Sequence, residues 1–480
     1  MPEPPEELPL DFGPRSNGEF VPVPLTAVQR ETVRRLRSIA DDRARRLGMT
    51  RRRFLASAAG MTTAMAILNA CSSEEAAQSA APTPAVAPTA TSAPTPTSEP
   101  GGTFEVPEEA VEDVEAAEDL LAGDEFIFDL QTHFLEYETE PARQGGLDFW
   151  RFFEQPGCTG RDCFDLDSYF ELIFGRSDTN VAMLSALPIL PMGSPLDRAL
   201  MLEARAVADT VCGPDRLLLH GQALPNIGDL DLMLAGMEEL AGSSPVAAWK
   251  SYTHFAPGGA SPWRLDDGDA SVPAVGRALI EKAIEIGVPR IAVHKGLSSR
   301  NPWSSPADFG PAAAAYPEMS FIAFHSGFEV ADTEGPYGEG TRGVGVNRLI
   351  AGMIDNGVGP NQNVYAELGS TWWLLRGRPT EAAHVIGKLL VHVGEDNLLW
   401  GTDSLWYGTP QDQIESFRAF EISEEFQELY GYPALTAERK RKIFGINAAR
   451  LHGLEDPTRD NCTFTADAVT AYRQESSLLL

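Results

Sequence analysis

Positively charged side chains are scarce in this chain of 480 residues. Lys and Arg number 38 against 69 Asp and Glu, which gives a net charge of -31. A nucleic-acid partner requires concentrated positive charge to neutralise its phosphates, so the composition argues against that class of partner. The excess of acid predicts a solvated, negatively charged surface, and the length suffices for one large domain with extensions.

Cysteine is also rare, and long apolar runs are missing. The five cysteines are Cys71, Cys158, Cys163, Cys212 and Cys462. No CxxC pair occurs among them, so a structural zinc site built on cysteine is not expected. The spacing of Cys158 and Cys163 is compatible either with a disulfide bond in an exported protein or with two unpaired thiols. No apolar run reaches the roughly 18 residues that a membrane-spanning helix needs.

Residues 49–71 carry the pattern of an export signal. Residues 51–55 read Arg-Arg-Arg-Phe-Leu, and the uncharged stretch 56–70 follows them. A charged segment before a short apolar stretch with small residues is typical of a signal peptide. The arginines followed by Phe-Leu resemble a twin-arginine signal, and Leu-Asn-Ala-Cys at 68–71 resembles a lipobox. We therefore expect export by the twin-arginine route to the periplasm or another extracytoplasmic location, with membrane attachment through a lipid on Cys71.

The signal divides the chain into segments of different composition. Residues 1–48 form an N-terminal extension, within which 26–47 are rich in Arg, Ala and Leu and are expected to be helical. Residues 72–119 begin with a stretch of Ser, Ala, Pro, Thr and Glu that cannot bury a core, so they are expected to form a disordered linker. The main domain is expected at 120–455, with a loose tail at 456–480.

Eight short β-rich runs alternate with helical stretches in the main domain. The runs are Phe126–Leu130, Asn180–Leu187, Arg216–Leu224, Ala247–Thr253, Arg290–His294, Phe321–His325, Val364–Leu368 and Leu398–Asp403. Nearly continuous apolar runs between helices indicate a parallel sheet covered on both faces. Eight such units favour a (β/α)8 TIM barrel, an α/β fold, over the alternative of a doubly wound open sheet. No GxGxxG follows the first run, so a dinucleotide-binding fold has little support.

Two further features extend this barrel. The segment 134–179, between the first and second runs, is too long for an ordinary loop. It is expected to form a lid or a small subdomain over the mouth of the barrel. Additional helices follow the eighth run, and the last of them is expected within Thr436–Leu454.

Polar side chains occupy the ends of several predicted strands. Gln131 and His133 close the first run, His294 and His325 end the fifth and sixth, and Asp403 ends the eighth. The carboxyl ends of the strands form the active site in a TIM barrel, so these side chains are expected to converge. Imidazoles with a carboxylate are the ligands that a catalytic divalent metal requires, and zinc is the metal expected. A single histidine is usually structural, and the prediction depends on the shared placement of all of them.

Five ordered motifs in the main domain resemble those of a known family. They are Phe128–Phe134, Ile291–His294, Phe321–Gly327, Leu399–Asp403 and Lys442–Leu451. Together they resemble the amidohydrolase superfamily, and more narrowly the amidohydrolase-related group that includes aminocarboxymuconate-semialdehyde decarboxylase. The resemblance implies a TIM barrel with a metal held by His133, His294 and Asp403, to which Gln131 and His325 could add ligands. It also implies catalytic roles for His325 and Asp403.

Position 131 departs from the family pattern, which usually opens with His-x-His or with an acidic residue in place of the first histidine. A Gln carbonyl can ligate a metal, but it is neutral and a poorer zinc ligand than imidazole. Gln131 is therefore either a weak ligand or a residue that supports the ligands without touching the metal. His133, His294 and Asp403 would suffice, because catalytic zinc commonly keeps three protein ligands.

Three more residues are candidates for substrate contacts or for support of the ligands: Lys250, His254 and Trp406. Some amidohydrolases carry a carboxylated lysine on the fourth strand that bridges two metals. Lys250 lies on that strand, and an ion pair or a substrate contact is its other interpretation. Aromatic residues such as Trp406 are compatible with an apolar substrate or with ordinary packing.

Three functions follow from these residues. The first is a metal-dependent hydrolase, in which metal-activated water attacks the carbonyl of a small molecule. The second is a non-oxidative, metal-dependent decarboxylase, a lyase that the family builds from the same ligands. The third is a ligand-binding lipoprotein without catalysis, which the departure at Gln131 suggests. An exported location favours hydrolysis.

Overall fold

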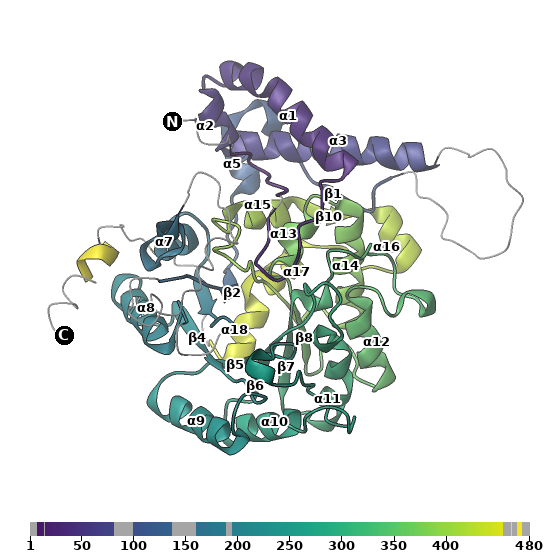
Figure 1. Ribbon diagram of the computed structural model, residues 1–480. Helices are drawn as coiled ribbons and strands as arrows, with labels where there is room; N and C mark the ends of the chain where they lie inside the picture. The colour runs from purple at the N-terminus through teal and green to yellow at the C-terminus, as the bar shows by residue number, and fades with distance from the viewer. Residues whose placement is uncertain are drawn as a thin grey trace, which may run out of the picture.

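The computed structural model describes residues 7–13, 15–80, 99–136, 160–188, 194–454, 462 and 468–472. Eight parallel strands in chain order form its centre (Figure 1). The strands are β2 (Phe128–Thr132), β3 (Val181–Leu184), β4 (Leu217–Gln222), β5 (Ala248–Tyr252), β6 (Arg290–His294), β7 (Ser320–Phe324), β8 (Val364–Glu367) and β9 (Leu398–Leu399). Each predicted run overlaps one of these strands, so the predicted order is confirmed.

The first and last strands meet and close the sheet into a barrel. The backbone N–H of Leu130 donates to the carbonyl of Trp400 over 3.1 Å, and that of Asp403 donates to the carbonyl of Gln131 over 2.9 Å. Thr132 and Ser404 also form a parallel bridge. These contacts confirm the predicted (β/α)8 barrel, and they place residues 131 and 403 side by side.

Side chains of each strand alternate between two apolar layers. In β7, Phe321 and Ala323 pack outward in the large cluster that includes the helices. Ile322 and Phe324 belong to the smaller cluster inside the barrel. This alternation is the two-residue period of a strand that is buried on both faces.

Helices surround the strands (Figure 1). They are α8 (Arg198–Val211), α9 (Leu230–Ser243), α10 (Gly276–Glu285), α11 (Phe309–Ala315), α12 (Asn347–Asp355), α13 (Thr371–Leu375), α14 (Pro379–His392) and α15 (Gln411–Ala419). Asp197 and Asp229 begin α8 and α9 by accepting hydrogen bonds from backbone N–H groups of the first turn. The predicted C-terminal helices are present as α16 (Glu424–Tyr430), α17 (Ala437–Arg441), the π-helical turn η9 (Lys442–Ile446) and α18 (Asn447–His452).

Residues before the barrel form a folded N-terminal helical unit, which lies along one edge of the barrel (Figure 1). Its helices are α1 (Ala27–Arg46), α2 (Arg51–Leu55), α3 (Ala58–Ala80), α4 (Glu108–Glu112) and α5 (Val114–Leu121), and its strand β1 (Gly102–Phe104) pairs with β10 (Phe420–Ile422). The helix expected within 26–47 is confirmed as α1, which Thr26 caps. Within the part of the chain described, no helix is both long and apolar enough to cross a membrane.

The expectation of a disordered linker at 72–119 is wrong for the portions that the structure describes. Residues 72–80 continue α3, and 99–119 contain β1, α4 and most of α5. Specific polar contacts hold this region. Asn69 exchanges two hydrogen bonds with the backbone of Phe104, and the Thr62 hydroxyl donates to the carbonyl of Ala110. Composition alone does not reveal such contacts.

The predicted signal segment lies within this unit. The Arg-Arg-Arg-Phe-Leu motif forms α2, whose Phe54 and Leu55 are buried. Cys71 has a free thiol and is buried in α3. Export and lipidation at Cys71 stay predictions.

The predicted lid and tail fall partly outside the described residues, which omit 137–159 and most of 456–480. The rest of the insertion forms η2 (Arg161–Phe164), α7 (Leu166–Phe170) and the π-helical turn η3 (Glu171–Gly175). Cys163 is disulfide-bonded, while Cys158 lies outside the described residues. A disulfide between Cys212 and Cys462, which the sequence did not predict, ties the tail to the end of α8.

Candidate active site

The predicted site residues come together at the carboxyl ends of the strands. His133, His294, His325 and Asp403 are each at most 3% exposed, and Gln131 is equally buried. Gln131 Nε2 lies 2.8 Å from Asp403 Oδ1, and His133 Nε2 lies 3.2 Å from the same oxygen. The His294 and His325 rings are 4.6 Å apart between centroids. The convergence expected from the strand ends is therefore present.

Backbone carbonyls fix the tautomers of the three histidines. His133 Nδ1 lies 2.7 Å from the Ser185 carbonyl, His325 Nδ1 lies 2.7 Å from that of Gly369, and His294 Nε2 lies 2.9 Å from that of Gly296. A carbonyl only accepts, so each of these nitrogens carries the proton. In a neutral ring the other nitrogen then carries a lone pair, which is Nδ1 in His294 and Nε2 in His325, whereas Nε2 of His133 lies against the carboxylate of Asp403. This arrangement is typical of histidines that bind a metal.

Burial keeps two of these rings neutral. It lowers the pKa of His325 to about 4 and that of His294 well below its ordinary value, with repulsion from neighbouring histidines adding to the second shift. A neutral imidazole is the form that ligates a metal.

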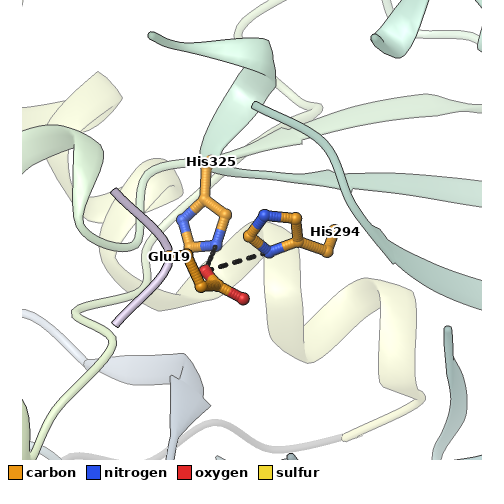
Figure 2. A group of neighbouring side chains, drawn as sticks. All are labelled: Glu19, His294 and His325. Atoms are coloured by element: carbon orange, nitrogen blue, oxygen red, sulfur yellow. Dashed lines mark ion pairs between the residues drawn. The ribbon is translucent and has the colours of Figure 1, made fainter. Parts of the chain in front are cut away.

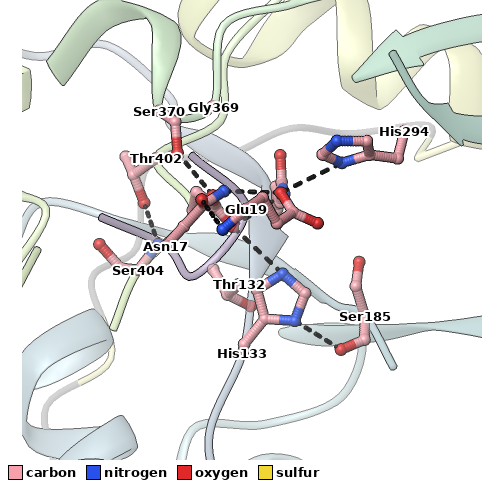
Figure 3. A network of polar contacts seen from close by, with 12 residues as sticks. Asn17, Glu19, Thr132, His133, Ser185, His294, Gly369, Ser370, Thr402 and Ser404 are labelled. Carbon is pink, nitrogen blue, oxygen red and sulfur yellow. Dashed lines mark hydrogen bonds and ion pairs between the residues drawn. The ribbon is translucent and has the colours of Figure 1, made fainter. Parts of the chain in front are cut away.

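A segment of the N-terminal extension, residues 15–23, reaches into this centre (Figure 3). Glu19 Oε2 lies 3.3 Å from His294 Nδ1 and 3.8 Å from His325 Nε2 (Figure 2). One ligand atom from each of these three residues lies within 4.8 Å of the others. Burial raises the pKa of Glu19 to about 8, and repulsion from Asp403 adds to the shift.

Asp403 accepts hydrogen bonds from several directions. Asn17 Nδ2 donates to its Oδ2 over 3.0 Å, and the Ser370 hydroxyl donates to the same oxygen over 2.6 Å (Figure 3). Gln131 Nε2 donates a hydrogen bond to the other carboxylate oxygen, Oδ1. Burial alone would raise the pKa of Asp403, but hydrogen bonds with His133 and Ser370 help to outweigh it and hold the pKa below its ordinary range. Asp403 is therefore ionised at neutral pH.

The backbone is strained at the same place. His325, Ser326, Ser370 and Asp403 have φ angles of 63°, 53°, 57° and 59°, in the left-handed region that non-glycine residues avoid. Each such residue costs about 1–3 kcal/mol, and strain of this kind gathers at active sites. Its concentration on His325 and Asp403 supports a functional role for both.

Residues 197–454, more than half of the chain, match the family model described as amidohydrolase. The chain belongs to the amidohydrolase family. Enzymes of this family depend on a metal, and the neutral imidazoles and carboxylates at the barrel mouth are a donor set that fits a divalent cation.

Solved structures with a similar fold share little sequence with this amidohydrolase. An uncharacterized TIM-barrel protein from Bordetella bronchiseptica is 14% identical, with 68% of this chain and 98% of that chain covered and a TM-score of 0.44. A 2,6-dihydroxybenzoate decarboxylase from Rhizobium is 16% identical, with 69% and 100% covered and a TM-score of 0.40. A dihydroxybenzoic acid decarboxylase from Polaromonas, with bound manganese and 2-nitroresorcinol, is 14% identical, with 69% and 98% covered and a TM-score of 0.37. Among curated proteins no match was found.

Gln131 presents its amide nitrogen, not its oxygen, to Asp403 in this amidohydrolase. Its Oε1 is buried without a hydrogen-bond partner among the described residues, and it lies beside Gly369, where a Cβ would approach it to 2.4 Å. Gln131 thus acts as a donor that fixes Asp403 in this conformation. Its role as a metal ligand stays a prediction.

Lys250 lies inside the barrel on β5 and is fully buried. Its Nζ sits 3.5 Å from the Phe324 ring centroid and has no hydrogen-bond partner within the described part of the chain. Burial lowers its pKa to about 7, although Glu19 and other nearby carboxylates oppose the shift. Lys250 is therefore a buried cation or amine beside the centre, and neither of its predicted roles is decided.

The other two supporting candidates pack on histidines of this centre. The His254 ring centroid is 4.9 Å from that of His294, and burial lowers the pKa of His254 to about 4. Trp406 stacks on His133 with centroids 5.4 Å apart and planes at 19°. Both are placed to orient these two rings.

Sequence reasoning missed Asn17, Glu19 and Ser370. Asn17 and Glu19 lie in a segment assigned to the extension, outside every predicted strand end. Asn17-Gly18 is a turn signal, but a turn signal does not say what the turn contacts.

Proposed function

We propose that this amidohydrolase is a metal-dependent hydrolase that acts on a small carbonyl substrate. The observation that supports this most is the convergence of His133 and of the unprotonated ring nitrogens of His294 and His325 with the ionised Asp403. His133 Nε2 and His294 Nδ1 would hold the metal, with Asp403. When bound, a divalent metal supplies Lewis acidity and makes water acidic enough to lose a proton near neutral pH.

The remaining groups handle the proton. Asp403 is ionised and fixed by Gln131 and Ser370, so it can accept a proton from the attacking water. His325 Nε2 has a free lone pair, because its Nδ1 donates to the Gly369 carbonyl. It can take that proton and deliver it to the leaving group. We expect zinc from the preference of this metal for imidazole nitrogen and carboxylate oxygen.

Decarboxylation of a small carboxylic acid is the second candidate. Lys250 favours it, since a buried ammonium without a hydrogen-bond partner is suited to a substrate carboxylate. The third possibility, a binding protein without catalysis, has less support because His325 and Asp403 both lie at the centre in strained conformations.

One experiment separates the two reactions. The purified full chain is analysed for bound metal and then supplied with esters, lactones, amides and aromatic carboxylic acids in water enriched in oxygen-18. Hydrolysis places the heavy oxygen in the product acid, whereas decarboxylation releases CO2 and places solvent hydrogen on the product. Absence of bound metal, or full turnover by Asp403→Asn, would exclude both mechanisms.

We also propose export by the twin-arginine route. The disulfide bonds at Cys163 and between Cys212 and Cys462 support it, because such bonds persist in oxidising compartments. Cleavage before Cys71 would remove Glu19 from the centre, so the mass of the protein isolated from its native cells decides between a retained and a removed N-terminal unit. A cytoplasmic, fully reduced protein would contradict export.

A further inference from the structure

We propose that Glu19 is a metal ligand of this centre, supplied by the N-terminal segment in place of the acidic residue or histidine that position 131 lacks. This inference rests on the proposed metal-dependent function. It concerns a residue outside the barrel and outside the stretch that matches the family, 197–454.

Three hydrogen-bond acceptors face one another in this centre. His294 Nδ1 and His325 Nε2 carry lone pairs, since the opposite nitrogen of each ring donates to a backbone carbonyl. Both face the same oxygen of Glu19, at 3.3 and 3.8 Å (Figure 2). Acceptors at this range repel one another unless a proton or a cation lies among them, and a divalent cation can satisfy all three at once.

The spacing of those atoms also suits a shared metal ion. Two ligands on one tetrahedral zinc, with bonds of about 2.0–2.2 Å, lie roughly 3.3–3.5 Å from each other. The separation of 3.3 Å between Glu19 Oε2 and His294 Nδ1 is within that range. The 3.8 Å to His325 Nε2 is longer than that range, which suits a proton-transfer group beside the metal.

The charge of the site also favours Glu19 as a ligand. Position 131 holds a neutral amide, and its nitrogen donates a hydrogen bond to Asp403. The carboxylate that the barrel strands contribute here is therefore that of Asp403, which also contacts His133. Glu19 adds a second carboxylate, which brings the charge of the ligands to that of a divalent cation. Placing two anions and a dication together in a buried site reduces the uncompensated charge.

Local contacts hold Glu19 in this position. Asn17 Nδ2 donates to Glu19 Oε2 over 2.7 Å, and the Glu19 N–H donates to Asn17 Oδ1 over 3.1 Å (Figure 3). The Ser16 hydroxyl donates to the carbonyl of the buried Phe20 over 2.6 Å. Gly18 has φ 87°, a conformation that favours glycine and lets the turn enter the barrel mouth. The turn is therefore built to present this carboxylate.

The test compares metal affinities of full-length variants by zinc titration against a competing chelator, with cobalt(II) absorption as a second readout. Glu19→Gln should weaken zinc binding by about 100-fold and shift the cobalt spectrum, because a charged ligand is lost. Glu19→Asp keeps the charge but shortens the side chain, so it should give an intermediate loss. Glu75→Gln removes the same charge from the exposed face of α3 and should change nothing.

A rescue variant makes the test specific. Gln131→Glu in the Glu19→Gln background returns a carboxylate from the barrel strand, so zinc affinity should recover by about tenfold or more. Circular dichroism verifies that each variant is folded. A Glu19→Gln protein with wild-type zinc affinity and an unchanged cobalt spectrum would overturn the role of Glu19 and leave the proposed function intact. A wild-type protein that binds neither metal would overturn both.

Discussion

Asn17 donates a hydrogen bond to Asp403 over 3.0 Å, although 386 residues separate the two along the chain. The same amide nitrogen lies 2.7 Å from Glu19. Asn17 therefore joins a carboxylate of the N-terminal segment to the carboxylate that follows the last strand of the barrel. This contact makes the N-terminal segment a part of the candidate active site.

Replacing Asn17 should loosen both carboxylates. In Asn17→Ala we expect kcat/KM to fall by about tenfold, because a hydrogen bond to a charged group contributes about 1.5–3 kcal/mol and part of it is restored by water. Steady-state kinetics on the substrate found by the screen measure the change. Gln78→Ala, on the exposed face of α3, is the matched control and should keep the wild-type value. Identical kinetics in both variants would show that Asn17 has no part in the site.

Neutralising Asp403 should remove both metal and activity. Asp403→Asn takes away the carboxylate that contacts His133 and accepts from Gln131. We expect bound zinc to fall well below one equivalent by elemental analysis and kcat to fall by at least about 1000-fold. Asp215→Asn is the control, since this aspartate is exposed near the end of α8. Stoichiometric zinc in Asp403→Asn would refute its role as a ligand.

The buried pair of Lys388 and Glu334 should respond differently to single and double substitution. Both side chains are fully buried, and Lys388 Nζ lies 2.5 Å from Glu334 Oε2. Lys388→Met leaves an uncompensated buried carboxylate and should lower the free energy of unfolding by about 3–5 kcal/mol. Adding Glu334→Gln should recover a large part of that loss. Denaturant unfolding of the three proteins provides the comparison, and equal stability of the two variants would argue against coupling.

His384 should make stability depend on pH. Burial lowers its pKa from 6.5 to about 3, and the charge of Lys388 adds to the shift. At pH values between these two pKa values, the unfolded chain therefore binds a proton on His384 and the folded chain does not. The stabilisation is complete above pH 6.5 and is lost as the pH falls toward 3. Thermal melting should show a smaller loss between pH 6.5 and 4 in His384→Gln than in the wild type, and parallel curves would contradict this.

The barrel was predictable because its signal is local and repeated. Each apolar run that became a strand, such as Phe321–His325, carries the pattern by itself, and parallel strands bring their carboxyl ends together without further information. His294, His325 and Asp403 could be identified for this reason. Their convergence follows from the topology.

The remaining features depend on contacts between distant segments, which the sequence does not encode locally. Glu19 does not lie at the end of a strand, and its position depends on the path of the whole N-terminal segment across the barrel mouth. The pairing of Cys212 with Cys462 links residues 250 positions apart, and spacing does not reveal connectivity. The linker prediction failed in its described parts because a few hydrogen bonds, such as those of Asn69, order a segment of unremarkable composition.

The contact between β2 and the segment after β9 is a seam that closes the barrel. The candidate active site can form only after both sides of this seam have been synthesised. Gln131 and His133 belong to one side of this seam and Asp403 to the other, while Asn17 reaches across from the very start of the chain. A ribosome adds about 5–20 residues per second, so the 386 residues between Asn17 and Asp403 take roughly 20–80 s to emerge. From the synthesis of His133 until Asp403 emerges, the nascent chain holds histidines without their carboxylate partner. Metal loading is therefore a late event, which follows synthesis of nearly the entire barrel.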